Sequence, residues 1–379
     1  MTIAERVRPA DAESCVRALA DADAGRRTLR VRGGGTKDHL GELLPVDGVL
    51  ETTALSGIVA HVPADLTVTV GAGTPFSALR AALRAHDQFL PLDPPHGDTA
   101  TVGGIVAANS TMFWRARYGG VRDLLIGTAA ALVDGTVVRS GGRVVKNVAG
   151  YDLNKLFTGS LGTLGVLVEC TFKVLPLPAA TSGARARYPR ASEAFAAADA
   201  VARTSARPAA LVVTGTRGGW EVLLQANGDR PAVERTVGLL RGGERDDAIE
   251  GALETPREVA GGDHGVVVRA SIPIAAQAAF AATAAGLEGF TQIVADAASG
   301  IALTRVEGDD DVLCDGADAL LAAAHICGGS ARVEWRPDAL RSRIAFWGGA
   351  EPAGAALMRR IKEAFDPHGT LEPGRMPLS

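Results

Sequence analysis

Two glycine-rich segments constrain this chain more than any other feature. Residues 32–37 read RGGGTK after a short β-type run, and residues 146–165 read KNVAGYDLNKLFTGSLGTLG. A loop without side chains lets backbone N–H groups approach a phosphate or a flat ring closely. We therefore predict that the two segments are opposite walls of one cofactor site, and that a cofactor, not a side-chain triad, carries the chemistry.

The bulk composition limits the class of protein. A length of 379 residues favours two or three domains. Hydrophobic residues make up 47% and charged residues 22%, as in ordinary soluble globular proteins. The net charge of −4 gives no sign of the basic face that a nucleic-acid-binding protein needs. We expect a globular protein without a nucleic-acid partner.

The cysteines and histidines argue against a metal centre. None of the four cysteines stands in a C-x-x-C pair, and the seven histidines lack the helical spacing of metal ligands. The N-terminal residues lack the apolar core of a signal peptide, and stretches such as 124–133 are too short to span a bilayer. We expect a cytoplasmic protein with reduced thiols; peripheral association with the inner face of the cell membrane through a partner stays open.

Local patterns predict the elements. Strands are expected at 28–32, 66–71 and 165–175, and two strands around the turn 134–135 within 124–138. Thr74 and Pro75 suit the start of a helix over 76–86. Residues 91–109 read as a turn-rich loop. Prolines after 175 mark a boundary, and strand and helix patterns then alternate up to 335. That alternation predicts an antiparallel sheet with helices on one face.

Each glycine motif also has a plain structural explanation. Residues 33–35 suit a surface turn, 101–109 a packing corner, and Gly159, Gly162 and Gly165 the packing of a helix. Gly71 and Gly73 open no dinucleotide-binding helix, because Phe76 occupies the third glycine position. The P-loop and G-x-S-x-G patterns are absent. Four glycine-rich segments in one half of the chain nevertheless favour a binding site.

The N-terminal half resembles the vanillyl-alcohol-oxidase (PCMH-type) family of FAD-binding proteins, and within it the glycolate oxidase E-subunit family. The resemblance rests on RGGGTK at 32–37, PLDPPHGDTATVGGIVAAN at 91–109, RYGGVRDLLIG at 117–127, KNVAGYDLNKLFTGSLGTLGV at 146–166 and DPHGTLEPGR at 366–375. It implies an α+β fold with an FAD-binding domain of two subdomains at 1–178. An antiparallel-sheet and helix cap of ferredoxin-like type would span 179–335, and a C-terminal segment, 336–379, would return to the FAD domain.

The resemblance also implies site residues. The pyrophosphate would be held by Gly33, Gly34, Gly35, Thr36 and Lys37. The second phosphate and the ribityl chain would lie along Asp98, Thr99, Thr101, Gly103, Gly104 and Asn109. The path from adenine to isoalloxazine would follow Gly162, Gly165 and Val166, and Arg375 would approach the flavin from the tail.

Departures from the family pattern qualify the function. Relatives with covalent flavin carry a histidine in the first loop, where this chain has Thr36 and Lys37, so FAD is expected to be non-covalent. Hydroxy-acid-oxidising relatives read Gly-Ser-Glu-Gly where Leu161 stands here, and Asn-Pro-Gly-Lys where 372–375 read EPGR. The chain also lacks a His-x-Gly-Asp-Gly-Asn segment, which helps such relatives to build a substrate and metal site.

The resemblance therefore implies an FAD-binding subunit of a glycolate (D-2-hydroxy acid) oxidase complex. Its partners would be a homologous catalytic FAD subunit and an iron–sulfur subunit, and its substrate a small hydroxy acid oxidised as glycolate is to glyoxylate. Two alternatives stay open: a self-sufficient FAD-dependent D-2-hydroxy acid dehydrogenase, and a non-catalytic FAD-binding assembly subunit. Catalytic residues are not identified; Lys146, Tyr151 and Arg336 are candidates for handling a substrate carboxylate and hydroxyl.

Overall fold

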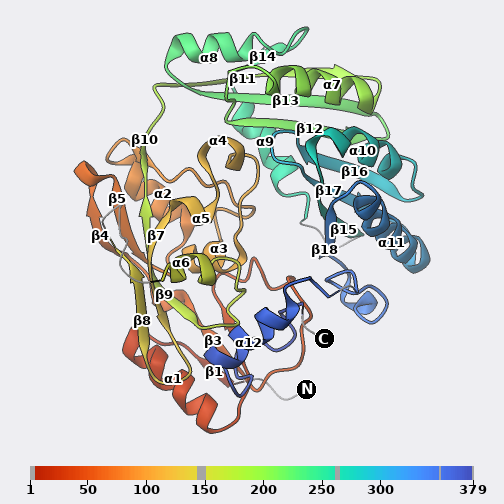
Figure 1. Ribbon diagram of the computed structural model, residues 1–379. Coiled ribbons are helices and arrows are strands. Elements are labelled where there is room, and N and C mark those ends of the chain that lie inside the picture. The colour runs from red at the N-terminus through yellow and green to blue at the C-terminus, as the bar shows by residue number, and fades with distance from the viewer. Residues whose placement is uncertain (1–4, 143–150, 261–264, 350, 378–379) are drawn as a thin grey trace. The chain divides into compact units, whose positions relative to one another are not determined.

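The computed structural model describes residues 5–142, 151–260, 265–349 and 351–377 (Figure 1). The chain divides into two compact units. Unit 1 contains residues 1–111, 119–177 and 351–379, and unit 2 contains 112–118 and 178–350. The chain therefore passes between the units four times, and the units are described separately.

Unit 1 combines three small sheets with helices. Its elements are β1 (Glu5–Val7), α1 (Ala12–Ala24), β2 (Leu29–Arg32), β3 (Gly48–Glu51), β4 (Ile58–Val62), β5 (Thr67–Gly71), α2 (Phe76–Arg84), β6 (Gln88–Phe89), α3 (Val102–Ala108), α5 (Val121–Leu124), β7 (Leu125–Ala131), β8 (Val137–Gly141), α6 (Leu153–Phe157), β9 (Val166–Lys173), β10 (Leu175–Pro176) and α12 (Ala355–Phe365), with 3₁₀ turns at Thr52–Ala54 and Pro63–Asp65.

The two main sheets of unit 1 differ in direction. Strands β1, β3 and β2 form a parallel sheet in that order, whereas β4-β5-β9-β7-β8 is antiparallel throughout. All of β5 is buried, and β9 is mostly so, because apolar residues cover both faces of this sheet. Val70 and Phe172 pack with α2 and α3 on one face, and Val168 packs with α1 on the other.

Unit 2 is built on one antiparallel sheet of eight strands, in the order β14-β11-β13-β12-β16-β17-β15-β18. Its elements are α4 (Arg115–Tyr118), β11 (Ala180–Tyr188), α7 (Ala191–Ala202), β12 (Ala210–Thr216), β13 (Gly219–Gly228), α8 (Arg230–Val237), β14 (Glu244–Asp246), α9 (Ile249–Arg257), β15 (Val266–Ser271), α10 (Gln277–Ala285), β16 (Phe290–Asp296), β17 (Ile301–Val306), α11 (Asp310–Ile326) and β18 (Ser330–Trp335), with 3₁₀ turns at Ile274–Ala276 and Asp338–Leu340.

The sheet of unit 2 consists of two similar halves. From β11 to β14 the main elements run strand-helix-strand-strand-helix-strand, and from β15 to β18 they repeat that order. The second strand of each half, β12 and β16, pair antiparallel and join the halves into one sheet. The order of strands along the chain predicts one eight-stranded sheet only if the two halves are recognised as repeats of the same motif.

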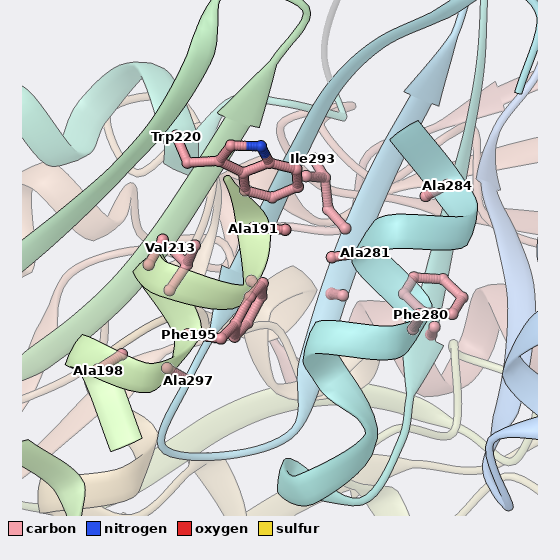
Figure 2. Packing of buried hydrophobic residues seen from close by; sticks show 14 of the residues in the cluster. Ala191, Phe195, Ala198, Val213, Trp220, Phe280, Ala281, Ala284, Ile293 and Ala297 are labelled. Carbon is pink, nitrogen blue, oxygen red and sulfur yellow. The ribbon is translucent and has the colours of Figure 1, made fainter. Parts of the chain in front are cut away.

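Apolar residues on one face of this sheet pack against α7, α8, α10 and α11. Figure 2 shows part of this core, where Phe195 and Trp220 lie on one side and Phe280 on the other. The helices bring mostly alanine to the interface, so the aromatic rings fill much of the remaining space. On the opposite face, α9 and the segment Met112–Tyr118 cover part of the sheet.

The structure differs from the sequence expectations in several elements. Residues 102–108 form α3 rather than a loop, and α2 begins at Phe76 with Pro75, not Thr74, as its N-terminal flanking residue. Thr74 instead accepts a hydrogen bond from the N–H of Gly57. The C-terminal part of unit 1 begins at 351, so residues 336–350 belong to unit 2 and not to the returning segment. Helix α9 lies on the sheet face opposite the other helices.

Candidate functional site

A groove in unit 1 brings the two glycine-rich segments together. It lies between β2, the 33–38 loop, α3 and the segment 160–167. Most of the predicted cofactor residues line it: Gly33, Gly34, Gly35, Thr36, Lys37, Thr101, Gly103, Gly104, Gly162, Gly165, Val166 and Arg375. Segments more than 100 residues apart in sequence thus share one concave surface, which is the usual form of a cofactor site.

The 33–37 loop supplies hydrogen-bond donors to this groove. Within the described chain, the N–H groups of Gly34, Gly35 and Thr36 donate to no protein acceptor. Arg32 and Asp38 close the loop through an ion pair of 2.7 Å. Gly35 has a φ of +77°, which only glycine adopts readily. Three consecutive donors on a closed loop fit the phosphate oxygens of a dinucleotide.

Glycine is required here because two backbone segments lie in contact. A Cβ atom on Gly33 would lie 2.2 Å from Thr101 Oγ1, and one on Gly34 would lie 2.1 Å from the carbonyl oxygen of Thr99. Both distances are far inside van der Waals contact, so a side chain at either position forces the loop away from residues 99–101. The three glycines therefore allow the loop to pack against residues 99–101, and they also leave the groove open to a ligand.

The N-terminus of α3 is not an anion site of its own. The N–H of Val102 donates to the Thr74 carbonyl, that of Gly103 to the Ala72 carbonyl, and that of Gly104 to Thr101 Oγ1. These bonds leave few donors for a phosphate. The small residues of α3 instead let its backbone form a wall: a Cβ on Gly104 meets only Thr101 Oγ1, at 3.2 Å.

The C-terminal tail adds a buried ion pair to the groove. Arg375 Nε lies 3.1 Å from Glu372 Oε2, and its Nη1 donates to the carbonyl of Lys37. Glu372 Oε1 accepts the N–H of Val31 at 2.8 Å. Burial raises the pKa of the Glu372 carboxyl, while the Arg375 charge opposes that rise. The EPGR sequence thus links the tail to both β2 and the 33–37 loop.

Helix α12 also contacts the tail and fixes its position. Leu29, the first residue of β2, and Leu371 pair as an isolated parallel bridge. Lys362 Nζ donates to the carbonyls of Thr163 and Leu371 at 2.8 and 2.9 Å and forms an ion pair with Asp366. One buried ammonium therefore joins α12, the segment beside Gly162 and the tail.

Some predicted residues lie away from the groove. Asp98 is exposed and pairs with Arg80, and Thr99 contributes its carbonyl to packing rather than its hydroxyl to the groove. Asn109 ends α3 with a φ of +48°. Lys146 lies outside the described residues. Tyr151 is 92% exposed in unit 1, whereas Arg336 is buried in unit 2 over the ring of Phe346.

The structure adds groove residues that the sequence analysis missed. They are Val31, Asp38, Thr52, Ala72, Ala107, Ala108, Ser160, Leu161 and Leu167. Most of them lie within a few residues of a predicted position in the sequence, so including the neighbours of each motif would have identified them. Thr52 and Ala72 lie in segments whose sequence gave no indication of ligand binding. Ala72 lies between Gly71 and Gly73, whose missing side chains admit the carbonyls of Leu55 and Thr52.

Comparisons with known proteins agree with this geometry. Residues 4–141 match a family model described as FAD binding domain, and residues 349–376 match one described as FAD linked oxidases, C-terminal domain. The chain is 43% identical over 166 residues to glycolate oxidase subunit GlcE of Escherichia coli (strain K12), covering 43% of this chain and 47% of that protein. It is 34% identical over 174 residues to glycolate oxidase subunit GlcD of Bacillus subtilis (strain 168), covering 45% and 37%.

The fold itself matches that of a solved structure. A structure of alkyldihydroxyacetonephosphate synthase superposes with a TM-score of 0.75 at 15% identity, covering 96% of this chain and 76% of that one. Such a low identity supports the fold alone. The chain spans less than half the length of the glycolate oxidase subunits that it matches.

The N-terminal region is therefore an FAD-binding domain of the PCMH type, and FAD is its cofactor. The predicted α+β fold class is confirmed. More particularly, the chain is similar to the E subunit of bacterial glycolate oxidase, as the motif set predicted. Among the described residues, no helix is long and apolar enough to cross a membrane, and no cluster of His, Cys, Asp and Glu could hold a metal ion.

Proposed function

We propose that this chain is the FAD-binding E-type subunit of a glycolate (D-2-hydroxy acid) oxidase complex. The single observation that supports it most is the groove, in which the family's motifs meet around three unbonded N–H groups. The similarity to two glycolate oxidase subunits supports the substrate class. Bound FAD would supply the acceptor for a hydride, which carries two electrons, from the hydroxy acid.

The residues of this chain have binding roles in that proposal. The 33–37 loop would hydrogen-bond the pyrophosphate, and Thr101, Gly104 and Gly162, which line the groove, would let the cofactor lie against backbone. Arg375 stabilises the loop by donating a hydrogen bond to the carbonyl of Lys37. We propose that a homologous FAD subunit and an iron–sulfur subunit complete the complex; the similarity to two proteins named as glycolate oxidase subunits supports a complex of several chains.

The alternatives remain distinct proposals. A self-sufficient dehydrogenase needs a base and a carboxylate partner on this chain, and an assembly subunit needs neither. Anaerobic bleaching of the flavin band by glycolate or D-lactate separates them. We expect slow or no bleaching of the isolated FAD-loaded chain, and turnover once the two partner subunits are added. Fast bleaching of the isolated chain would favour the dehydrogenase. If the complex turns over equally fast whether or not this chain carries FAD, the assembly role is favoured.

The mode of FAD attachment gives a first test. The 33–37 loop carries no histidine, so we propose that FAD is held non-covalently. Acid or heat precipitation of the purified protein is expected to leave the yellow chromophore in the supernatant. Flavin that stays with the washed pellet would show a covalent link and contradict this proposal.

A further inference from the structure

The C-terminal tail places an arginine in the wall of the unit 1 groove. Arg375 is only 4% exposed and lines the groove. Its Nη1 donates to the Lys37 carbonyl at 3.1 Å, and its Nε lies 3.1 Å from Glu372 Oε2. In the part of the chain that the structure describes, Nη2 donates to no acceptor, and unlike Nε it keeps accessible surface. An open N–H group on an almost buried guanidinium calls for an acceptor from outside the protein.

The bond to Lys37 puts this guanidinium at the end of the 33–37 loop. The Lys37 carbonyl also accepts the N–H of Leu40, so the end of the loop is fixed from two sides. The three backbone N–H groups of the loop that donate to no protein acceptor are neutral donors. A guanidinium beside them adds a charged donor, and its planar fork matches the oxygens of a phosphate.

Glu372 fixes the orientation of the guanidinium. Its φ is +47°, a left-handed conformation that is rare for glutamate and better tolerated by asparagine or aspartate. Its buried carboxylate divides its oxygens between two partners, because Oε1 accepts the Val31 N–H at 2.8 Å and Oε2 pairs with Arg375. The length of a glutamate side chain thus links β2 to Arg375, and strain of this kind is typical of functional sites.

Arg30 shows what a purely structural partner of Glu372 looks like. Its Nε lies 3.9 Å from Glu372 Oε2, and its Nη2 donates to the Leu44 carbonyl at 2.8 Å. Arg30 is not among the residues that line the groove, whereas Arg375 is. A structural ion pair therefore explains Arg30, but it leaves the open Nη2 of Arg375 without a purpose.

We propose that Arg375 binds the diphosphate of FAD and that Glu372 is the positioning residue that orients it. Nη1 and Nε are engaged by the protein, so Nη2 is left for a phosphate oxygen beside the 33–37 loop. The sequence motif implied that Arg375 approaches the flavin; its bond to Lys37 favours the diphosphate instead. This role rests on the proposed function only for the place of the diphosphate, and it needs no hydroxy-acid substrate.

The test is calorimetric titration of the FAD-free, full-length chain with FAD, with ADP and with riboflavin. We expect Arg375→Met to weaken FAD and ADP each about tenfold or more, because a charged hydrogen bond is lost. Riboflavin has no phosphate, so its affinity should not change. Arg375→Lys keeps the charge without the fork and should give a smaller loss. Arg30→Met, the matched control, should leave all three affinities unchanged.

Glu372→Asp tests the positioning role. Aspartate keeps the charge and suits the positive φ, but it is one methylene shorter and cannot hold both the Val31 N–H and Arg375. We expect it to weaken FAD and ADP about fivefold in the wild-type background and to have no further effect in the Arg375→Met background. A purely structural Glu372 would weaken FAD equally in both backgrounds, which would contradict its positioning role.

Other outcomes would overturn the role of Arg375. Unchanged FAD and ADP affinities in Arg375→Met would exclude a contact with the diphosphate. Equal losses for riboflavin and FAD, with ADP unaffected, would place Arg375 at the flavin ring. If Arg375→Met does not fold, Arg375→Lys takes its place in both comparisons. A wild-type chain that binds no FAD would contradict the proposed function as well, whereas normal wild-type binding with unaffected variants would contradict this inference alone.

Discussion

At the scale of single residues, glycines in the groove have two different roles. Gly34 is packed against the Thr99 carbonyl, whereas Gly104 faces space limited only by Thr101 Oγ1 at 3.2 Å. A side chain at Gly34 therefore disturbs the protein, and a side chain at Gly104 extends into the space where the cofactor is proposed to lie. Substitutions at the two positions separate folding from cofactor binding.

We predict that Gly104→Leu weakens FAD binding about tenfold or more, because its side chain occupies the groove without meeting backbone. The apoprotein is expected to unfold at the wild-type temperature, since alanine-like helix propensity at this position offsets the small displacement of Thr101. Gly104→Ala is the matched control and should retain FAD. Unchanged flavin occupancy in Gly104→Leu would show that α3 does not line the cofactor.

For Gly34→Ala we predict a loss of about 1–3 kcal/mol in the unfolding free energy of the apoprotein, besides weaker FAD binding. The cause is a Cβ atom 2.1 Å from the Thr99 carbonyl oxygen. Chemical denaturation of the FAD-free chain measures it. An apoprotein as stable as the wild type would mean that the loop moves freely and that the close packing is unimportant.

The sequence predicted the position of this loop but not the reason for its glycines. Its pattern indicates a bend without side chains, and Gly35 with its φ of +77° agrees with that. The close contact between residues 33–34 and 99–101 depends on tertiary structure that no local pattern encodes. Asp98, Thr99 and Asn109 were assigned to the site by motif position, and the groove lining does not include their side chains.

At the scale of elements, the tail and α12 act as one support for the groove. Lys362 joins the Thr163 and Leu371 carbonyls, and Asp366 accepts the N–H groups of Thr370 and Leu371 at 2.8 Å each. Burial lowers the pKa of Lys362, and the Asp366 carboxylate opposes that. The sequence shows α12 as a helix, but nothing in it distinguishes this buried lysine from the exposed Arg360 two residues earlier.

We predict that Lys362→Met costs about 3 kcal/mol of unfolding free energy, because it leaves the buried Asp366 carboxylate without its counter-ion. FAD affinity should fall as well, since the segment beside Gly162 and the tail lose their common anchor. Arg360→Met, on the same helix but exposed, is the control. If Lys362→Met binds FAD normally while Arg360→Met also does, the tail does not support the groove.

At the scale of the whole molecule, the two units have separate apolar cores. Their boundary after residue 177 follows the proline-rich end of β10, which is why the sequence indicates it within a residue. The inclusion of 112–118 in unit 2 has no comparable signal, because Phe113 and Trp114 read as ordinary loop residues until their partners on β13 and α9 are known. Separate cores imply that the units can unfold separately.

The reactivity of the four cysteines shows whether the two units open separately. Cys15 and Cys170 are fully buried in unit 1, and burial raises the pKa of each thiol to about 12. Cys314 on α11 and Cys327, which directly follows that helix, lie partly exposed in unit 2. At pH 8 we expect a thiol reagent to label the unit 2 pair first, and the unit 1 pair only when unit 1 opens. Fast labelling of all four thiols in the native protein would contradict the burial of Cys15 and Cys170.

Bound FAD is then expected to protect unit 1 selectively. A ligand that binds only the folded state at 100 times its Kd stabilises that state by about 2.7 kcal/mol, which slows labelling through opening about 100-fold. We predict this slowing for Cys15 and Cys170 and little change for Cys314 and Cys327. Peptide mass spectrometry of timed samples with and without FAD measures all four rates. Equal slowing at all four thiols would show that the units open together, and no slowing at Cys15 and Cys170 would place FAD binding outside the unit 1 groove.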